Sequence, residues 1–443
     1  MSMVIKTNMD AMRTLNLMTA NQSAAQKYLE KVSTGMKIRN AQDDASAYAI
    51  SEHMRVRIRA LDQAHANTQN GSNMLKTAET AVANIVDAIK TLKEKAIDSA
   101  NDSNTDEDRL LIQKEFNQFV DAIDDNALIT FNNKYLIDGT RNNAFVPAKT
   151  ILLNQRLSAA TTVDTALTDL KNRADEGLGI RETDYYQVSW VMDGKLSEAS
   201  GRVGNKTLTD ILQINNVSDL QATTDGLITG ITDKFGKDVY TPDKSQGLVI
   251  SSLANADGSD ALDNQITGFT ISITDADGNV KKSVNSVLDQ FNQYQRAETQ
   301  TGDQALSFHV GADSNFATKF ALMDMRAAAL GLKGSDGNIL SISTKNDANA
   351  AINVLDNVLQ KVLDQQSIIG AALSRLERTS ANLTTMITDD QSSESTIRDA
   401  DMAKEMTNYT KYSLLTQTSQ AMLAQANQNP NNALYLLGEN ETE

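Results

Sequence analysis

Cysteine is absent from this chain of 443 residues, so its fold has no disulfide and its chemistry has no thiolate. Basic side chains are outnumbered, with 41 Lys and Arg against 57 Asp and Glu. The formal net charge of −16 argues against a nucleic-acid partner. Aromatic residues make up only 5% of the chain and there is one tryptophan, which is little for a large globular core and usual for long helices packed in rows.

Long apolar runs are also missing. No stretch reaches the roughly 18 apolar residues of a membrane-spanning helix, so we expect no membrane contact. Residues 1–8 contain no apolar run of the kind that marks a signal peptide. Taken alone, these two features favour a cytoplasmic protein.

Groups that could carry catalysis or hold a metal are few. His53 and His65 lie about three helical turns apart and cannot share a metal, and His309 stands alone. No metallopeptidase, nucleophile-elbow or phosphate-loop motif occurs, so we expect neither an enzyme nor a cofactor or metal. Residues 275–279 hint at a calcium loop, but the glycine comes too early and no glutamate follows at the required offset. They are expected to form a hairpin turn.

Apolar residues recur at alternating steps of three and four in both halves of the chain, as in helices that pack nearly parallel or antiparallel. The first series is Leu75, Ala78, Val82, Ile85, Ile89, Leu92 and Ala96. The second, apolar at nine of eleven positions, is Ile352, Leu355, Leu359, Val362, Gln366, Ile369, Leu373, Leu376, Ser380, Leu383 and Ile387. A shorter helix is expected over 106–124, with a start signal at 104–106. Its predicted packing face is Leu111, Glu115, Phe119 and Ala122.

The segment 141–305 loses this periodicity and is rich in glycine turn signals. Residues 269–274 alternate, turn at 275–279 and resume at Val280, which predicts a hairpin. A further strand is expected over 186–192, with short helices over 207–213 and 283–292. The segment is therefore predicted to be an inserted α+β region.

Two helical segments, 14–26 and 413–438, contain no charged residue. Amides and hydroxyls take the places where lysine and glutamate normally stand on a solvated helix. Burial among neighbouring copies explains this, because such groups form hydrogen bonds without the desolvation cost of an ion. A solvated amphipathic tail is the alternative.

Five sequence blocks resemble those of bacterial flagellin, the subunit of the flagellar filament. Residues 33–38 (Ser-Thr-Gly-Met-Lys-Ile) and 41–45 (Ala-Gln-Asp-Asp-Ala) together resemble its N-terminal block. The others, in the family's order, are 67–71, 131–136, 308–312 and 423–427. The resemblance covers about residues 1–140 and 306–443.

The resemblance implies a mainly α fold, a long antiparallel helical bundle or coiled coil from both termini with an inserted α+β, hairpin-containing variable domain. It also implies a structural filament subunit that self-assembles into a helical tube for motility. The implied divisions are 1–46, an inner-tube helix and connecting segment; 47–140 and 306–390, the outer-tube core; 141–305, the surface insert; and 391–443, a connecting segment and the C-terminal inner-tube helix.

The resemblance assigns subunit contacts to two groups of residues. Arg39, Asp43 and Asp44 lie in the connecting block, and the second group is Leu423, Gln425, Ala426, Asn427 and Leu437. From the residues alone, Asp43 and Asp44 are expected to be surface carboxylates that form capping or inter-subunit hydrogen bonds with Arg39 or Arg55.

The implied partners are further copies of the chain, the flagellar export apparatus and chaperone, and the filament cap and hook-junction proteins. Localisation is extracellular, in the flagellum, after export without a cleaved signal. Toll-like receptor 5 binds many flagellins through Leu-Gln-Arg-Val-Arg-Glu-Leu-Ala. The aligned residues 89–96 keep Glu94 and have Lys93, but Thr91 replaces the first arginine; on the next helix Glu115 matches and Phe119 replaces an arginine. We expect weak receptor binding, because threonine cannot replace bidentate donors.

Two other functions stay open at this point. The hook–filament junction protein shares the terminal blocks of flagellin. A surface adhesin or glycan-bearing module is the reading from a different class, because the insert is rich in serine and threonine.

Overall fold

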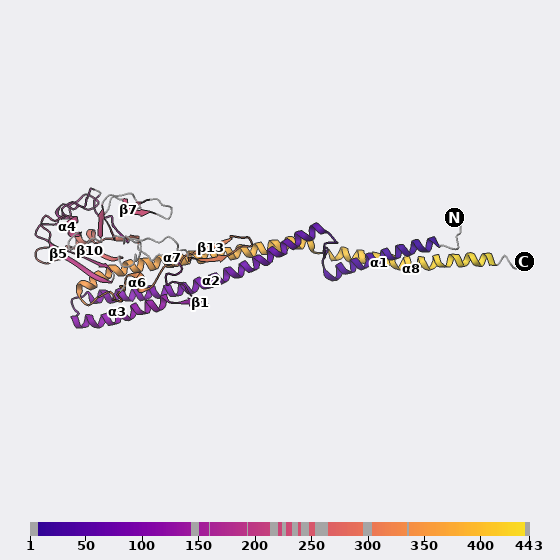
Figure 1. Cartoon of the computed structure of the whole chain (residues 1–443), viewed down its shortest axis with the longest axis horizontal. Helices are drawn as coiled ribbons and strands as arrows, with labels where there is room; N and C mark the ends of the chain where they lie inside the picture. The colour runs from indigo at the N-terminus through magenta and orange to yellow at the C-terminus, as the bar shows by residue number, and fades with distance from the viewer. Residues whose placement is uncertain are drawn as a thin grey trace. The chain divides into compact units, whose positions relative to one another are not determined.

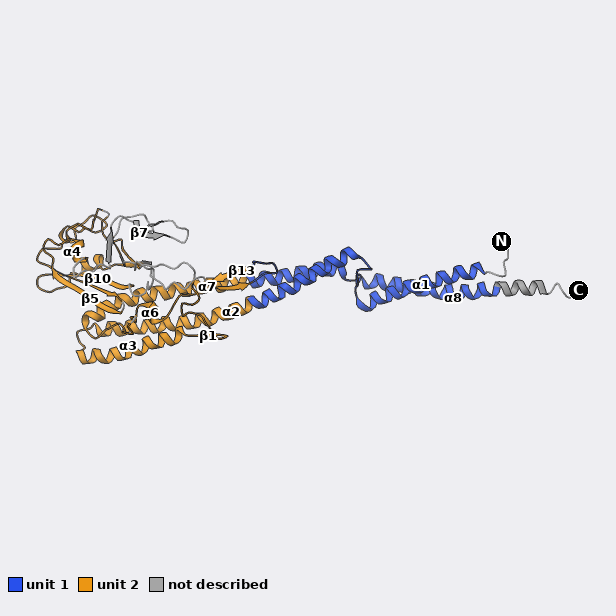
Figure 2. Ribbon diagram, viewed as in Figure 1, with its two compact units in different colours: residues 1–67, 310–316, 379–443 blue, residues 68–309, 317–378 orange. Residues whose placement is uncertain are grey.

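The computed structural model describes residues 8–142, 150–158, 160–192, 194–212, 220–223, 227–232, 238–240, 248–252, 265–295, 304–334 and 336–438. The chain divides into two compact units. Unit 1 contains residues 1–67, 310–316 and 379–443, and unit 2 contains 68–309 and 317–378 (Figure 2).

Helices dominate both ends of the chain (Figure 1). They are α1 (Met9–Thr34), α2 (Ala45–Ser99), α3 (Asp106–Ala127), the 3-10 turn η1 (Leu167–Asp169), α4 (Leu208–Leu212), α5 (Lys282–Leu288), α6 (Ala327–Leu330), α7 (Lys345–Arg398) and α8 (Met402–Gly438). The strands are β1 (Thr130–Phe131), β2 (Lys134–Tyr135), β3 (Ile151–Asn154), β4 (Tyr185–Met192), β5 (Lys195–Arg202), β6 (Leu220–Thr223), β7 (Leu227–Thr232), β8 (Asp238–Tyr240), β9 (Leu248–Ser252), β10 (Ile266–Thr274), β11 (Asn292–Gln295), β12 (Leu306–His309) and β13 (Ala317–Phe320).

The two predicted apolar series line the helical core. All seven residues of the α2 series are completely buried. In α7 the buried members are Leu355, Val362, Ile369, Leu373, Leu376 and Leu383. The predictions of two long packed helices are therefore confirmed. The stripes are buried because an apolar face on a long helix is stable only when another element covers it.

The predicted start of α3 is confirmed and its predicted face is wrong. Thr105 caps the helix and forms a capping box with Asp108. Leu111 is 62% exposed, whereas the buried residues are Arg109, Phe116, Val120, Ile123 and Ala127. The Arg109 side chain fixes this face, since it donates to the carbonyls of Ser99 and Asn101 at 2.9 and 3.0 Å.

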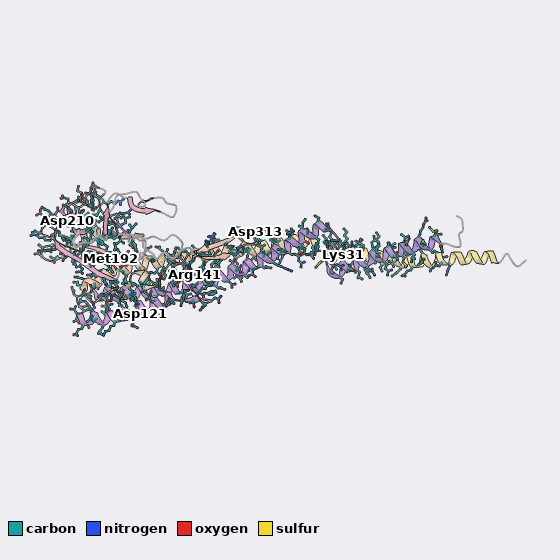
Figure 3. All side chains as sticks on the ribbon, viewed as in Figure 1. Lys31, Asp121, Arg141, Met192, Asp210 and Asp313 are labelled. Atoms are coloured by element: carbon teal, nitrogen blue, oxygen red, sulfur yellow. The ribbon has the colours of Figure 1, made fainter. Side chains whose placement is uncertain are left out.

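The central region of unit 2 has two larger antiparallel sheets, ordered β10-β4-β5 and β11-β3-β9-β6, and small pairs β12-β13 and β7-β8. Their apolar faces and helices α4 and α5 enclose a core that includes Trp190, Phe269 and Leu288. Met192, at the end of β4, and Asp210, in α4, are labelled in Figure 3. The predicted α+β insert is therefore present, with β4 and α4 where they were expected.

The predicted hairpin after β10 is only half right. The turn forms, with Asp275 N–H donating to the Asn279 carbonyl at 2.9 Å and a bridge between Thr274 and Val280. The chain then enters α5, whose Val284 and Leu288 are buried four residues apart, and β10 pairs instead with β4. That partner lies about 80 residues upstream, which local alternation cannot predict.

Candidate functional site

Helices α1 and α8 form an antiparallel pair (Figure 1). Asn21 Nδ2 donates to Ser419 Oγ at 3.2 Å, and the rings of Tyr28 and Tyr412 stack with centroids 5.3 Å apart. The ammonium of Lys31, labelled in Figure 3, lies 6.0 Å from the Tyr28 ring centroid. Polar and aromatic groups thus contribute specific contacts to this helix pair.

Both helices place their less exposed residues at alternating steps of three and four. On α1 these residues are Ala11, Thr14, Met18, Asn21, Ala25, Tyr28 and Val32. On α8 they are Glu405, Tyr409, Tyr412, Thr416, Ser419, Leu423 and Ala426. This is a coiled-coil seam. It covers little, because no residue of α1 is fully buried.

Large apolar side chains point away from this seam. Ten such side chains are between 38% and 65% exposed: Met9, Met12, Leu15, Leu17 and Leu29 of α1, and Met402, Met406, Leu414, Leu415 and Met422 of α8. Fully burying one such side chain stabilises a structure by about 1.5–3 kcal/mol. A single pair leaves this stabilisation unused, so the pair has the composition of part of a larger helical assembly.

A short backbone ladder joins the end of α1 to the start of α8. Gly35 ends α1 in the left-handed conformation, with φ +69°. Lys37 N–H donates to the Arg398 carbonyl at 2.7 Å, and Ala400 N–H donates to the Gly35 carbonyl at 2.9 Å. Asp401 then accepts from Ala403 N–H at 3.0 Å and caps α8.

Arg398 fixes α2 to the same joint. Arg398 is buried; its Nη1 lies 2.7 Å from Glu52 Oε1, and its guanidinium lies 5.7 Å from the Tyr48 ring centroid. The hydrogen bond from Arg398 holds the pKa of Glu52 below its ordinary value. Sequence reasoning missed this residue, because an arginine at a helix end resembles a solvated one.

Arg39, Asp43 and Asp44 lie together in the connecting block, each with a partner in its own chain. Arg39 pairs with Glu30 at 2.8 Å, and Asp43 accepts from Arg39 N–H and pairs with Lys27. Burial raises the pKa of Asp43, but these hydrogen bonds outweigh it and hold the pKa below its ordinary value. Asp44 accepts from the N–H groups of Ser46 and Ala47 at 3.0 Å and caps α2.

The expected residues of α8 divide between two faces. Leu423 and Ala426 lie on the seam, whereas Gln425 and Asn427 are exposed. Leu437 lies in α8, and its side chain is outside the described residues. Asn8, Asn21 and the tyrosine pair were missed, although Asn8 stands directly before a helix, where asparagine is a preferred cap.

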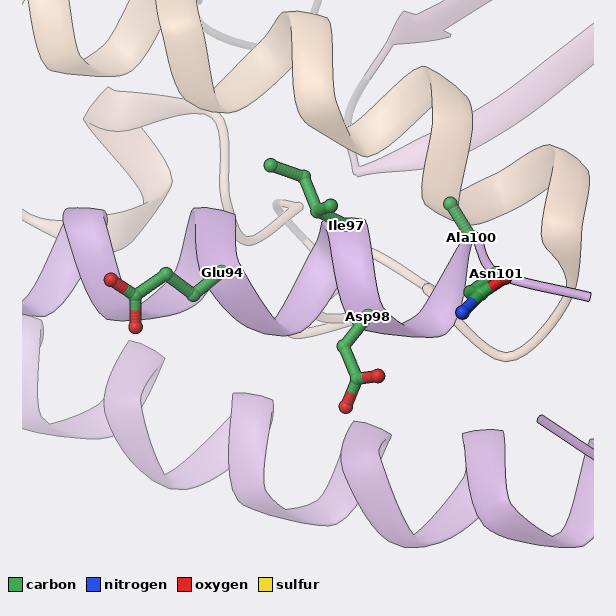
Figure 4. Close-up of a pocket in the computed structure, with 5 residues that line it drawn as sticks. All are labelled: Glu94, Ile97, Asp98, Ala100 and Asn101. Atoms are coloured by element: carbon green, nitrogen blue, oxygen red, sulfur yellow. The ribbon is translucent and has the colours of Figure 1, made fainter. Parts of the chain in front are cut away.

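Most of the expected receptor-facing residues are engaged within unit 2. Thr91 donates to the Asp87 carbonyl, Lys93 pairs with Asp356, and Glu115 pairs with Lys95 at 2.7 Å. Glu94 is exposed and lines a shallow hollow with two residues from the end of α2, Ile97 and Asp98, and two that follow the helix, Ala100 and Asn101 (Figure 4).

Within the described ranges, no three His, Asp or Glu side chains are close enough to hold a metal ion. No helix in the same ranges is long and apolar enough to cross a membrane. The residues of the 275–279 turn instead bond one another, with the Asp275 carboxylate accepting from Asp277 N–H and Asn279 N–H.

Long packed helices, a central insert and an incompletely covered terminal helix pair define a structural subunit of a helical assembly. Residues 5–142 match the bacterial flagellin N-terminal helical region, and residues 352–437 match the bacterial flagellin C-terminal helical region. Flagellin of Clostridium tyrobutyricum is 31% identical over 435 residues, covering 96% of this chain and 99% of that one. Flagellin of Bacillus subtilis is 27% identical over 455 residues, covering 98% and 100%.

The chain belongs to the bacterial flagellin family. It is a structural subunit of the flagellar filament, a component located outside the cell. Among solved structures, the flagellar junction protein FlgL of Legionella pneumophila is 13% identical, with a TM-score of 0.33 over 79% of this chain and 99% of that one.

Proposed function

We propose that copies of this chain polymerise through the exposed faces of α1 and α8, which would line the inner tube of the filament. Residues 1–46 and 391–443 would form this inner layer, 47–140 and 306–390 an outer tube, and 141–305 the outer surface. Ten exposed apolar residues among the described side chains of the pair support the proposal, since helices that expose such residues and have long uncharged segments gain most by packing against further copies.

The connecting block and the last helix would have different roles in this assembly. Arg39, Asp43 and Asp44 would stiffen the joint through their local bonds and present their remaining polar atoms to a neighbour. Gln425 and Asn427 are exposed and uncharged, which suits hydrogen bonds between subunits, and Leu423, Ala426 and Leu437 would pack.

The remaining assignments follow the family. The chain would have no catalytic activity, would leave the cell through the flagellar export apparatus without a cleaved signal and with a chaperone, and would meet cap and hook-junction proteins at the filament ends. Toll-like receptor 5 would respond weakly, because Thr91 lacks a cationic fork and Lys93 and Glu115 already have partners. Reporter-cell signalling at nanomolar monomer would contradict weak binding.

Electron microscopy after seeding or salting out tests the assembly proposal. The full chain should form long tubes, and a variant truncated after Thr410 should form none. Two single variants refine the test: Leu17→Gln and Met422→Gln, at sites 61% and 65% exposed, should lower tube yield. Val280→Gln is the matched control, at a 56% exposed site of the insert, and should assemble normally. Equal yields from all three variants would overturn the proposal.

A further inference from the structure

Asn8 contacts a backbone group that a proline has left without its helical partner. Helix α8 runs through Pro430, and a proline has no N–H to donate to the carbonyl four residues earlier, that of Ala426. Asn8 Nδ2 donates to this same carbonyl at 2.8 Å. The Asn8 Oδ1 accepts from Ala11 N–H at 3.0 Å and caps α1. The side-chain amide of Asn8 therefore donates one hydrogen bond and accepts another.

Two more contacts lie further along the seam, and both join one side chain to another. Asn21 bonds Ser419, and Tyr28 stacks on Tyr412 with an interplanar angle of 13°. We call three contacts the register contacts: Asn8 with the Ala426 carbonyl, Asn21 with Ser419, and Tyr28 with Tyr412. The rest of the seam is mostly alanine, threonine, methionine and valine, which discriminate poorly between neighbouring alignments.

A slide of α8 by one heptad destroys every register contact. In one direction Asn21 meets Ala426 and Tyr28 meets Ser419, and in the other Asn21 meets Tyr412 and Tyr28 meets Glu405. Asn8 would meet the carbonyl of Ala433 or Ser419, and each of these already has a donor within α8, from Leu437 or Leu423. Of these three registers, only the observed one gives Asn8 a carbonyl without a donor in its own helix.

We propose that the register contacts, with Asn8 and the carbonyl freed by Pro430 as the principal one, specify the alignment of α1 with α8. A seam made mostly of small and weakly apolar side chains cannot select its register by packing alone. A polar pair within a coiled coil does so, because a slipped register leaves the pair unsatisfied. Asn8 is thus a positioning residue for assembly, and Pro430 creates its acceptor. The inference concerns the pair itself and does not depend on which copies the pair contacts.

The absence of cysteine makes the register directly measurable in the full chain. Thr416→Cys is combined in turn with Ala25→Cys, Met18→Cys and Val32→Cys, three seam positions one heptad apart. Ala25 lies between Asn21 and Tyr28, and Thr416 between Ser419 and Tyr412, so only the Ala25 combination reports the observed register. Mild oxidation followed by electrophoresis gives the disulfide yield for each combination.

In the otherwise unchanged chain the Ala25 disulfide should exceed either slipped disulfide by about tenfold, the factor expected when a slipped register leaves a half-buried amide unpaired. Asn8→Asp keeps the cap and removes the donor, and should shift yield to the slipped combinations. Asn16→Asp is the control, an exposed asparagine of α1 off the seam, and should leave the ratio unchanged.

A double-mutant cycle separates register from general stability. Pro430→Ala restores the N–H that the Ala426 carbonyl lacks, so Asn8→Asp should change the disulfide ratio much less in that background. Variants that fail to assemble are co-assembled with excess parent chain before oxidation. Equal effects of Asn8→Asp with and without Pro430, or a ratio that Asn8→Asp leaves unchanged, would overturn the inference. Tube formation that fails while the ratio persists would count against the assembly proposal alone.

Discussion

Asp289 should make the stability of the central insert depend on pH. This residue ends α5 and its carboxylate faces α7, where Asn353 Nδ2 lies 3.5 Å from Oδ1. Two neighbouring contacts close the same interface: Asn357 Nδ2 donates to the Thr267 carbonyl at 3.0 Å, and Gly268 lies so close that a Cβ would stand 2.6 Å from Val354 Cγ2. Burial raises the pKa of Asp289 to about 7, and hydrogen bonds offset this only in part.

The direction and size of this pH dependence follow from the difference in proton binding between the folded and unfolded chain. Between about pH 4 and pH 7 the unfolded chain has lost this proton and the folded chain holds it, so the free energy of unfolding falls as pH rises and levels off above the folded pKa. A pKa raised from 3.8 to about 7 corresponds to at most about 4 kcal/mol. Because the side chain is partly exposed, we expect about 2 kcal/mol.

Urea unfolding followed by the fluorescence of Trp190 measures this directly, since the only tryptophan lies in the insert core and is 6% exposed. Asp289→Asn should match the parent near pH 4 and exceed it by about 2 kcal/mol at pH 8. Asp277→Asn, an exposed site in the preceding turn, is the control. Parallel stability curves for Asp289→Asn and the parent across this pH range would refute the reasoning.

Three further predictions concern the helices and their joint. Leu92→Ala should lower the free energy of unfolding of unit 2 by about 2–5 kcal/mol, measured by urea unfolding, because the residue is completely buried. Gly71→Ala should gain about 1 kcal/mol of helix propensity within α2, but its Cβ would stand 3.0 Å from the Phe308 ring. We expect this strain to outweigh the gain and to leave a net cost of about 1 kcal/mol in the same assay; a raised midpoint would contradict this contact. Arg398→Met should reduce the polymer that pellets at neutral pH. The parent should lose polymer in the same way as acid protonates Glu52 below its lowered pKa; a variant that pellets like the parent would rule out the joint as described.

Helix positions in this chain could be predicted from sequence where a long stripe repeats. The α2 series is completely buried because seven apolar residues at one spacing leave a single face to cover. The shorter α3 has too few apolar positions for one face to be clear from the sequence. Its buried face, which contains Phe116, is selected by tertiary contacts of Arg109. The partner of β10 was likewise set by a pairing distant in sequence.

The terminal site could be predicted as a region and not as contacts. The uncharged segments of α1 and α8 indicated burial among copies, and the structure shows which apolar residues they expose. The bond from Asn8 to the Ala426 carbonyl joins residues 418 positions apart, so no local pattern indicates it. Pro430, inside the uncharged helical segment 413–438, is the one sequence feature that indicates the need for this bond. A proline within a helix leaves the carbonyl four residues earlier without its usual donor, so that carbonyl must accept a hydrogen bond from elsewhere.

Amide hydrogen exchange, compared between monomer and pelleted polymer, tests most directly whether α1 and α8 are completed by further copies. The account predicts rapid exchange over both helices in the monomer and slowing by about a hundredfold or more in the polymer, with the buried stripe of α2 protected in both states. Equal exchange of α1 and α8 in monomer and polymer would contradict the account.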